Sequence, residues 1–258
     1  DNTATWTMDP LTGLGWGTVA INDLEYVPGP SNGSSPGYWM IAGANGQVAY
    51  LHKEYATTSG DWVMSALPGA DGVPVPLPPS APESIPVGTE GVAAAWGTDT
   101  VRTVGYGNGV WLIGGGENNS GTNVSSLLAR CTNLAGSPAW IFSYIGSDWN
   151  DYYVTDVKYG NGTWVVSGIH GKLAYSNNDA ASWTAITLPD TWGTSDIYSI
   201  SYEYGVWTIT GASGKIATST DGITWAMGST PSSLSTVSIR ASAHGNSASS
   251  GMEHILVG

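Results

Sequence analysis

The sequence predicts an all-β protein that folds as a single β-propeller of five four-stranded blades. Composition is the first observation behind this prediction, because the 258 residues include 36 Gly, 13 Trp and 13 Tyr, and only 10% are charged. Such a chain is poor in helix formers and rich in residues that favour short strands and tight turns. Two sequence patterns that recur along the chain are the other observations.

The first pattern is a small polar turn that ends in Trp. It reads SNNDAASW at 176–183 and STDGITW at 219–225, and the closing Trp residues are 42 positions apart. A similar turn precedes Trp6, Trp62 and Trp140. A turn that recurs at this spacing indicates a repeat architecture, in which each repeat is one supersecondary unit.

The second pattern is a Gly turn followed by an apolar strand that begins with an aromatic residue. It reads YGNGVWLIGG at 106–115, YGNGTWVVSG at 159–168 and YEYGVWTITG at 202–211, with variants at 37–51 and 244–258. Side chains in these segments alternate with period two, as half-buried strands require. Four short antiparallel strands in every 42–50 residues are typical of a propeller blade. A β-sandwich whose hairpins resemble one another by coincidence is the alternative fold.

The repeats divide the chain into five blades. In chain order the blades are 16–67, 96–145, 149–188, 192–229, and 234–258 together with 1–8. We expect the N-terminal strand to complete the last blade, because that closure joins the first and last blades and removes exposed sheet edges. The third strand of the last blade has no counterpart in the sequence. A longer native chain, a neighbouring chain that supplies the strand, and an incomplete blade are the three explanations.

Residues 68–91 interrupt the repeat between the first and second blades. They hold seven Pro residues, and Pro-rich segments favour extended conformations. We therefore expect an extended surface loop here.

Charge and composition exclude several classes of function. The net charge of −13 argues against nucleic acid, because phosphate binding needs a basic face. Cys131 is the single Cys, which rules out an internal disulfide and a Cys-based zinc site. The four His residues lack the spacing of metal ligands, and no apolar run is long enough to span a membrane. We expect no metal site, no cofactor, no nucleic-acid partner and no membrane insertion, and leave open only bound calcium, for which the loop from Asp148 to Asp151 is the first candidate.

The segment STDGITW at 219–225 resembles the Asp-box hairpin of the bacterial neuraminidase repeat, shortened by one residue. SNNDAASW at 176–183 keeps the Ser and Trp spacing but has its Asp displaced by one. The resemblance implies a β-propeller, a fold found in sialidases, lectins and phage virion proteins. It also implies that Ser219 and Asp221 stabilise the hairpin while Trp225 packs against the blade.

The resemblance raises the question of sialidase chemistry, which needs three Arg, a Tyr nucleophile assisted by a Glu, and an acid/base Asp. The chain has three Arg in total: Arg102 and Arg240 on inner strands, and Arg130 on an outer hairpin. Carboxylate pairs such as Asp148 and Asp151 could serve glycoside hydrolysis, but no motif distinguishes them from solvated loop acids. We expect that the protein is not an enzyme.

A second series of Trp residues supplies the candidate binding site. Each precedes the first strand of a blade, where the chain crosses between blades on one face of the disc; the four are Trp16, Trp96, Trp149 and Trp192. With Thr98, Asp151 and Thr194 beside them they predict a ring of ligand-binding residues, since sugar rings stack on indole and bond to polar neighbours. The other interpretation is a packing wedge between blades, which Leu234 in the fifth copy favours.

We therefore expect a non-enzymatic recognition or assembly module. The setting that the sequence suggests is a bacteriophage virion, as a tail or capsid-associated protein, or the extracellular space. Its partners would be a surface glycan or neighbouring subunits, including a chain that completes the fifth blade. The alternatives are a glycan-cleaving enzyme, sialidase-like or another glycoside hydrolase, and a purely architectural virion protein.

Overall fold

The structure is a computed structural model. It describes residues 16–29, 37–53, 62–67, 75–76, 93–94, 96–117, 126–134, 138–230, 232–247 and 251–257. In this part of the chain the regular elements are strands, apart from three short 3₁₀ helices, η2 (Ser147–Trp149), η3 (Ala212–Gly214) and η4 (Ser232–Leu234). The all-β prediction is confirmed. The expected strand at 1–8 lies outside the described residues, as does nearly all of the segment 68–91.

Sixteen of the strands form four antiparallel sheets of four strands, each with its strands in chain order. The first sheet contains β1 (Ile21–Val27), β2 (Gly37–Gly43), β3 (Val48–Lys53) and β4 (Trp62–Met64). The second contains β7 (Val101–Gly107), β8 (Val110–Gly115), β9 (Leu127–Cys131) and β10 (Ile141–Phe142). The third contains β11 (Val154–Gly160), β12 (Thr163–Gly168), β13 (Leu173–Ser176) and β14 (Thr184–Ala185). The fourth contains β15 (Ile197–Glu203), β16 (Val206–Gly211), β17 (Ile216–Ser219) and β18 (Ala226–Met227).

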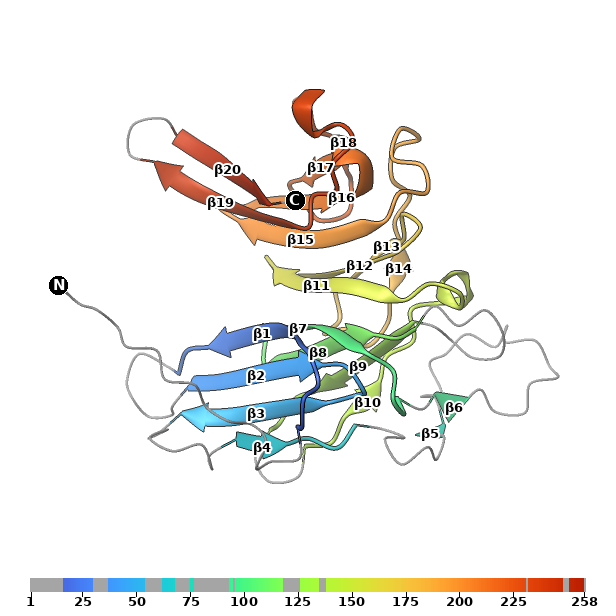
Figure 1. Ribbon diagram of the computed structural model, residues 1–258, viewed down its shortest axis with the longest axis vertical. Coiled ribbons are helices and arrows are strands. Elements are labelled where there is room, and N and C mark those ends of the chain that lie inside the picture. Colours follow the sequence, from blue (N-terminus) through green and yellow to red (C-terminus); the bar gives the residue numbers. More distant parts are fainter. Residues whose placement is uncertain are drawn as a thin grey trace.

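Two further pairs of strands complete the described structure. They are β19 (Ala241–Ser247) with β20 (Gly251–Val257), and the short pair β5 (Val75–Pro76) with β6 (Ala93–Ala94). The first strands of successive sheets pack side by side in the order β1, β7, β11, β15 and β19. Figure 1 shows the resulting succession, from the blue sheet β1–β4 to the red pair β19–β20. This is the arrangement of propeller blades, with β1, β7, β11, β15 and β19 as the inner strands.

Side chains on the inner strands join consecutive blades. In the first four inner strands the pairing register shifts after the first residue, as at a β-bulge. In the first three of these strands the side chain at the third position then accepts a backbone N–H from the next blade. Asp23 Oδ2 accepts from Val104 at 2.8 Å, and Thr103 Oγ1 accepts from Val157 at 3.3 Å. These bonds satisfy backbone N–H groups of the inner strands, each of which lies at the edge of its own sheet.

Tryptophans of the recurring polar turn join the blades at the outer rim. Trp140 Nε1 in the second blade donates to Ser65 Oγ of the first at 2.7 Å. Trp183 Nε1 in the third blade donates to Ser143 Oγ of the second at 2.8 Å. Each of these Ser residues follows the turn Trp of its own blade by three residues, so the two contacts are equivalent.

The turn itself is held by its Ser and by the residue two places further on. Asp221 Oδ1 accepts the N–H groups of Ile223 at 2.8 Å and Thr224 at 2.7 Å, and Ser219 Oγ donates to it at 2.8 Å. In the preceding blade Asn178 has this role, with its Oδ1 accepting the N–H of Ser182 at 3.0 Å. The displaced Asp179 instead accepts a bond from Asn108 of the second blade at 2.7 Å. The amide oxygen of Asn178 thus takes the place of the Asp221 carboxylate, in a turn that is one residue longer between its Ser and its Trp.

Within the described residues, no helix has the length and apolar character needed to cross a membrane.

Candidate ligand-binding site between the third and fourth blades

The four junction tryptophans are buried between blades. Trp16, Trp96, Trp149 and Trp192 are each at most 2% exposed. Three of the indole N–H groups are satisfied within their own turn, as when Trp192 Nε1 donates to the carbonyl of Ser195 at 2.9 Å. A sugar cannot stack on an indole that has no exposed face. The packing interpretation therefore describes these side chains, and a ligand site on this face has to be formed by residues around them.

Glycine in the preceding blade allows Trp96 and Trp192 to fit between the blades. A Cβ on Gly171 would lie 2.6 Å from the carbonyl oxygen of Gly193 and 3.4 Å from Cδ1 of Trp192. Gly46 meets Trp96 in the same way, at 2.6 Å from the carbonyl oxygen of Gly97. Both Gly residues also have positive φ, near 69° and 63°. The Gly of this turn is thus required twice, for its backbone conformation and for close packing between blades.

The polar residues predicted beside the tryptophans are exposed. Thr98, Asp151 and Thr194 each follow a junction Trp by two positions and face solvent. Of the predicted site residues, Trp149 and Thr194 are brought together at one pocket. The lining of that pocket does not include Trp16, Trp96, Thr98, Asp151 or Trp192.

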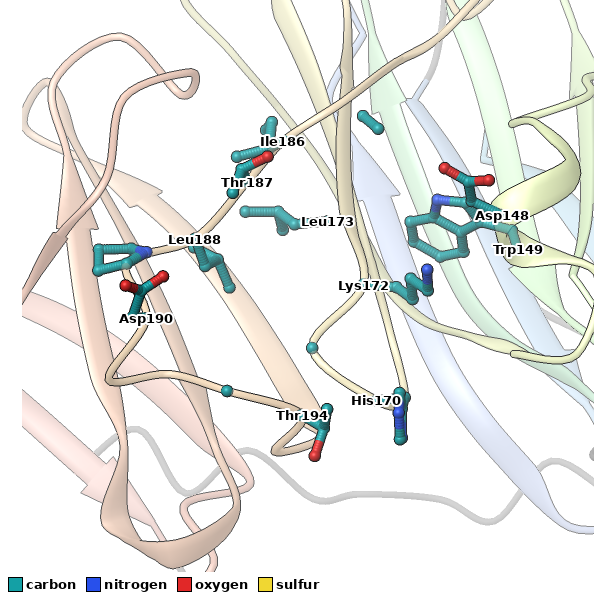
Figure 2. Close-up of a pocket in the computed structure, with 14 residues that line it drawn as sticks. Asp148, Trp149, His170, Lys172, Leu173, Ile186, Thr187, Leu188, Asp190 and Thr194 are labelled. Atoms are coloured by element: carbon teal, nitrogen blue, oxygen red, sulfur yellow. The ribbon is translucent and has the colours of Figure 1, made fainter.

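The pocket has a volume of about 480 Å³ and opens between the third and fourth blades. Three segments form it: the end of η2, the turn between β12 and β13, and the linker from β14 to β15. Figure 2 shows Asp148, Trp149, His170 and Lys172 on one side, and Leu188 and Asp190 on the other. Segments up to 46 residues apart in sequence, from Asp148 to Thr194, thus meet at a blade junction.

The floor of the pocket is aliphatic. Leu173 is buried, while Ile186, Leu188 and Pro189 are partly buried. The backbone fixes this floor, because the N–H of Ile186 donates to the carbonyl of Leu173 at 2.8 Å and continues the pairing of β14 with β13. The linker after Ile186 then turns its apolar residues toward the fourth blade, where they pack with its core.

Polar and charged groups line the rim. Asp148, Asp190, Thr187 and Thr194 supply carboxylate and hydroxyl oxygens, and His170 supplies an imidazole. His170 has a φ of 61°, and its N–H donates to Asp196 Oδ1 of the fourth blade at 2.8 Å. The positive φ and this bond fix the turn that carries His170.

An aromatic ring positions both basic side chains of the turn. The Tyr152 ring stacks with His170 at 5.0 Å between centroids and 9° between planes. The Nζ of Lys172 lies 4.9 Å from the centroid of the same ring, within the range of a cation–π contact. The ammonium group is therefore held at the pocket by an aromatic face, and the structure gives it no carboxylate partner among the described residues.

The equivalent lysine of the next blade is used differently. Lys215 Nζ donates to the carbonyl of Trp192. In the third blade the corresponding carbonyl, that of Trp149, accepts the N–H of Tyr152 at 3.0 Å instead. This local change leaves Lys172 available to a ligand. The sequence did not single out Lys172, because the Gly-Lys pair recurs in both blades.

The three arginines have separate partners, and none of them lines this pocket. The Arg102 guanidinium lies 4.0 Å from the centroid of the Tyr153 ring and 3.7 Å from Glu117. Arg240 lies 4.9 Å from the centroid of the Tyr198 ring. Arg130 Nη1 donates to the carbonyl of Asp179 at 3.4 Å. Each of the three arginines is thus placed by a contact between blades.

A smaller pocket of about 140 Å³ lies between the first and second blades, at the other end of the inner strands. Its lining includes Tyr38, Tyr106, Trp111 and Asn133. Buried Cys131 lies beside it in sequence, with Sγ 3.1 Å from the carbonyl of Asn133. Among the described residues no group of three His, Cys, Asp or Glu side chains could hold a metal ion.

The chain is similar in fold to solved β-propellers. It matches YCF48 bound to D1 peptide with a TM-score of 0.51 and 12% identity, over 81% of this chain and 54% of that one. It also matches the WD40 β-propeller domain of Doa1 (TM-score 0.49, 11% identity, 88% and 58% covered) and YCF48 from Cyanidioschyzon merolae (0.48, 12%, 83% and 57%). The chain thus spans little more than half the length of each.

The likeness to YCF48 bound to D1 peptide, together with the four four-stranded sheets, identifies the fold as a β-propeller. No family model matches the chain, and no curated protein matches it. At 12% identity the similarity concerns the fold alone, and the Asp-box resemblance stays a prediction.

Proposed function

We propose that the protein is a non-enzymatic recognition module that binds a surface glycan in the pocket between the third and fourth blades. The single observation that carries the proposal is the lining of this pocket, in which charged and hydroxyl groups surround an aliphatic floor. Ligand sites are typically concave, with volumes of about 300–1,000 Å³, an apolar lining and a few placed polar groups. A volume of about 480 Å³ falls within that range.

The position of the pocket supports the same proposal. Its walls are turns and linkers carried by a scaffold of rigid sheets, which is where binding residues are often found. Lys172 lies over the Tyr152 ring and is not paired with an acid in the described part of the chain, so its ammonium group can donate to a ligand oxygen without breaking a salt bridge. A bacteriophage virion or the extracellular space is the setting that we propose, with surface glycans or neighbouring subunits as partners.

We further propose that the fold is a closed ring of five blades, in which the N-terminal strand completes the last blade. The first blade supports this. Ile21 and Leu24 are 51% and 50% exposed, whereas Val101, Val104, Val154 and Val157, at the same positions of the next two inner strands, are at most 3% exposed. The face of β1 that carries Leu24 is apolar and has the residues of a blade-to-blade contact. In the closed ring the β19–β20 blade would cover it.

The function is tested by applying the purified chain to an array of microbial surface glycans and analysing the bound glycans for cleavage products. We expect saturable binding to a restricted set of glycans and no change in their length. Binding to none of them would contradict recognition of a glycan. Shortened products would instead place Asp148 and Asp190 in a hydrolytic site.

A further inference from the structure

We propose that the pocket selects sugar units that carry an acetamido group, as in N-acetylated hexosamines. This inference rests on the proposed function, since it names the ligand class of the same site. It begins from the kind of apolar surface that the pocket offers. Sites that hold the flat face of a pyranose use an exposed aromatic ring, but Trp149, the one indole in the lining, is 1% exposed.

The aliphatic floor suits a methyl group better than a ring face. Ile186 and Leu188 are partly buried and offer branched side chains to a ligand, whereas Leu173, like Trp149, is 1% exposed. The acetyl methyl is a small apolar group that such a floor can remove from water, and the amide attached to it distinguishes it from the methyl of a deoxy sugar. A sugar without it would bring a hydroxyl against the floor, where that hydroxyl would lose its bonds to water.

The rim suits the amide of the same group. An acetamido N–H needs an acceptor, and its carbonyl oxygen needs a donor. Figure 2 shows Asp190 beside Leu188 on one wall and Lys172 on the opposite wall. An amide lying across the floor between these walls would have a carboxylate for its N–H and an ammonium for its carbonyl.

The charge of the lining favours a neutral sugar. The lining contains two carboxylates, Asp148 and Asp190, and one ammonium group, that of Lys172, in a chain whose net charge is −13. A sugar carboxylate would meet two like charges and one opposite charge, and like charges brought together disfavour binding. Neutral N-acetylhexosamines are therefore expected to bind in preference to uronates.

Isothermal titration calorimetry with N,N′-diacetylchitobiose and cellobiose tests the inference. The two disaccharides share their linkage and differ in acetamido against hydroxyl at two carbons. We expect the acetylated disaccharide to bind at least about tenfold more tightly, the discrimination that a small apolar group gains in a fitted pocket. Leu188→Asn should reduce the preference to about twofold. The matched control, Val63→Asn, lies on the exposed outer strand β4 and should leave it unchanged.

A second measurement uses the wild-type protein, so its result does not depend on whether the variant folds. In saturation-transfer NMR the acetyl methyl protons should receive more saturation than the ring protons; the reverse order would overturn the inference. Equal affinity for the two disaccharides would also overturn it, while leaving glycan recognition intact. If neither disaccharide binds, the glycans that the protein retains on an array test the inference. Retained glycans that all contain acetamido sugars would uphold it, and retained glycans that lack the acetamido group would overturn it. If no glycan binds, the proposed function itself is wrong.

Discussion

The Oδ2 atom of Asp156 accepts the backbone N–H of Ile200 at 2.6 Å, and this bond joins the inner strands of the third and fourth blades. The other oxygen of the same carboxylate accepts the hydroxyl of Thr103 at 3.1 Å and the N–H of Val157 at 2.8 Å. One buried carboxylate thus contacts three consecutive blades. Its protonation state should influence how firmly they hold together.

Asp156 is expected to make the stability of the fold depend on pH. Burial raises the pKa of Asp156 to about 7, and the nearby charge of Asp23 adds to the rise, whereas an unfolded Asp has a pKa of about 3.9. A group whose pKa rises on folding stabilises fully below the unfolded value, and loses that contribution as the pH rises through the folded value. The unfolding free energy should therefore fall between about pH 4 and about pH 7.

Asp156→Asn tests this dependence, because an amide stays neutral across the whole range. Denaturant unfolding at a series of pH values should show a flatter profile for this variant, by up to a few kcal/mol, since one pKa unit corresponds to about 1.4 kcal/mol. Lys158 and Asp23 also influence Asp156 through their charges and stay unaltered in the variant. Asp151→Asn, at an exposed junction residue, should retain the wild-type slope. Equal slopes for wild type and Asp156→Asn would count against the role of Asp156.

The wedge role of the junction tryptophans predicts a large loss of stability. Trp192 has no exposed surface, and Trp192→Ala should lower the unfolding free energy by about 3–5 kcal/mol, the usual cost of removing a buried aromatic side chain. Tyr204→Ala, at a residue that is 62% exposed, should change it by less than about 0.5 kcal/mol. Chemical denaturation measures both. A Trp192→Ala protein that unfolds like wild type would mean that the indole is not a packing element.

The Asp221 hairpin predicts a smaller and acid-sensitive effect. Hydrogen bonds from the N–H groups of Thr224 and Ile223 lower the pKa of Asp221 to about 2. A lowered pKa stabilises the fold above the unfolded value of about 3.9 and loses this contribution as the pH falls toward 2. Asp221→Ala should therefore destabilise the protein by about 1 kcal/mol at neutral pH, as loss of a capping side chain does. The difference should shrink in acid, and thermal unfolding at neutral pH and near pH 2 compares the two; a constant difference would contradict the hydrogen-bonding role of the carboxylate.

If the ring is closed, placing a charged side chain on the first inner strand should destabilise the fold. If another blade covers Leu24, Leu24→Asp buries an unpaired carboxylate and should cost several kcal/mol. The matched substitution Val63→Asp, on an exposed face of β4, should cost less than about 0.5 kcal/mol. Thermal unfolding distinguishes the two outcomes. Equal, small shifts for both variants would indicate that the face of β1 stays open in solution.

Periodicity and turn chemistry made much of the fold predictable from sequence. The repeated Gly, aromatic and apolar positions of YGNGTWVVSG at 159–168 follow from strand alternation and from the packing of Tyr on Gly in the preceding blade. A Cβ on Gly160, for example, would lie 2.3 Å from the Tyr202 ring. Such requirements recur with each blade, so a single sequence displays them several times.

The site was less predictable, because it arises where one blade departs from the repeat. Lys172 and Lys215 occupy the same place in the pattern, yet Lys215 donates to the carbonyl of Trp192 while Lys172 lines the pocket. The junction tryptophans were visible in the sequence, but periodicity does not reveal whether a recurring indole faces solvent or the neighbouring sheet. That distinction depends on contacts between blades, which are set by tertiary structure.

The location of the ligand is the central claim, and a crystal structure of the chain with the glycan that binds most tightly on an array tests it most directly. We expect sugar density between the β12–β13 turn and the β14–β15 linker, with polar contacts to Lys172 and Asp190. Density elsewhere, as in the pocket lined by Tyr38 and Tyr106, would contradict the assignment of the site.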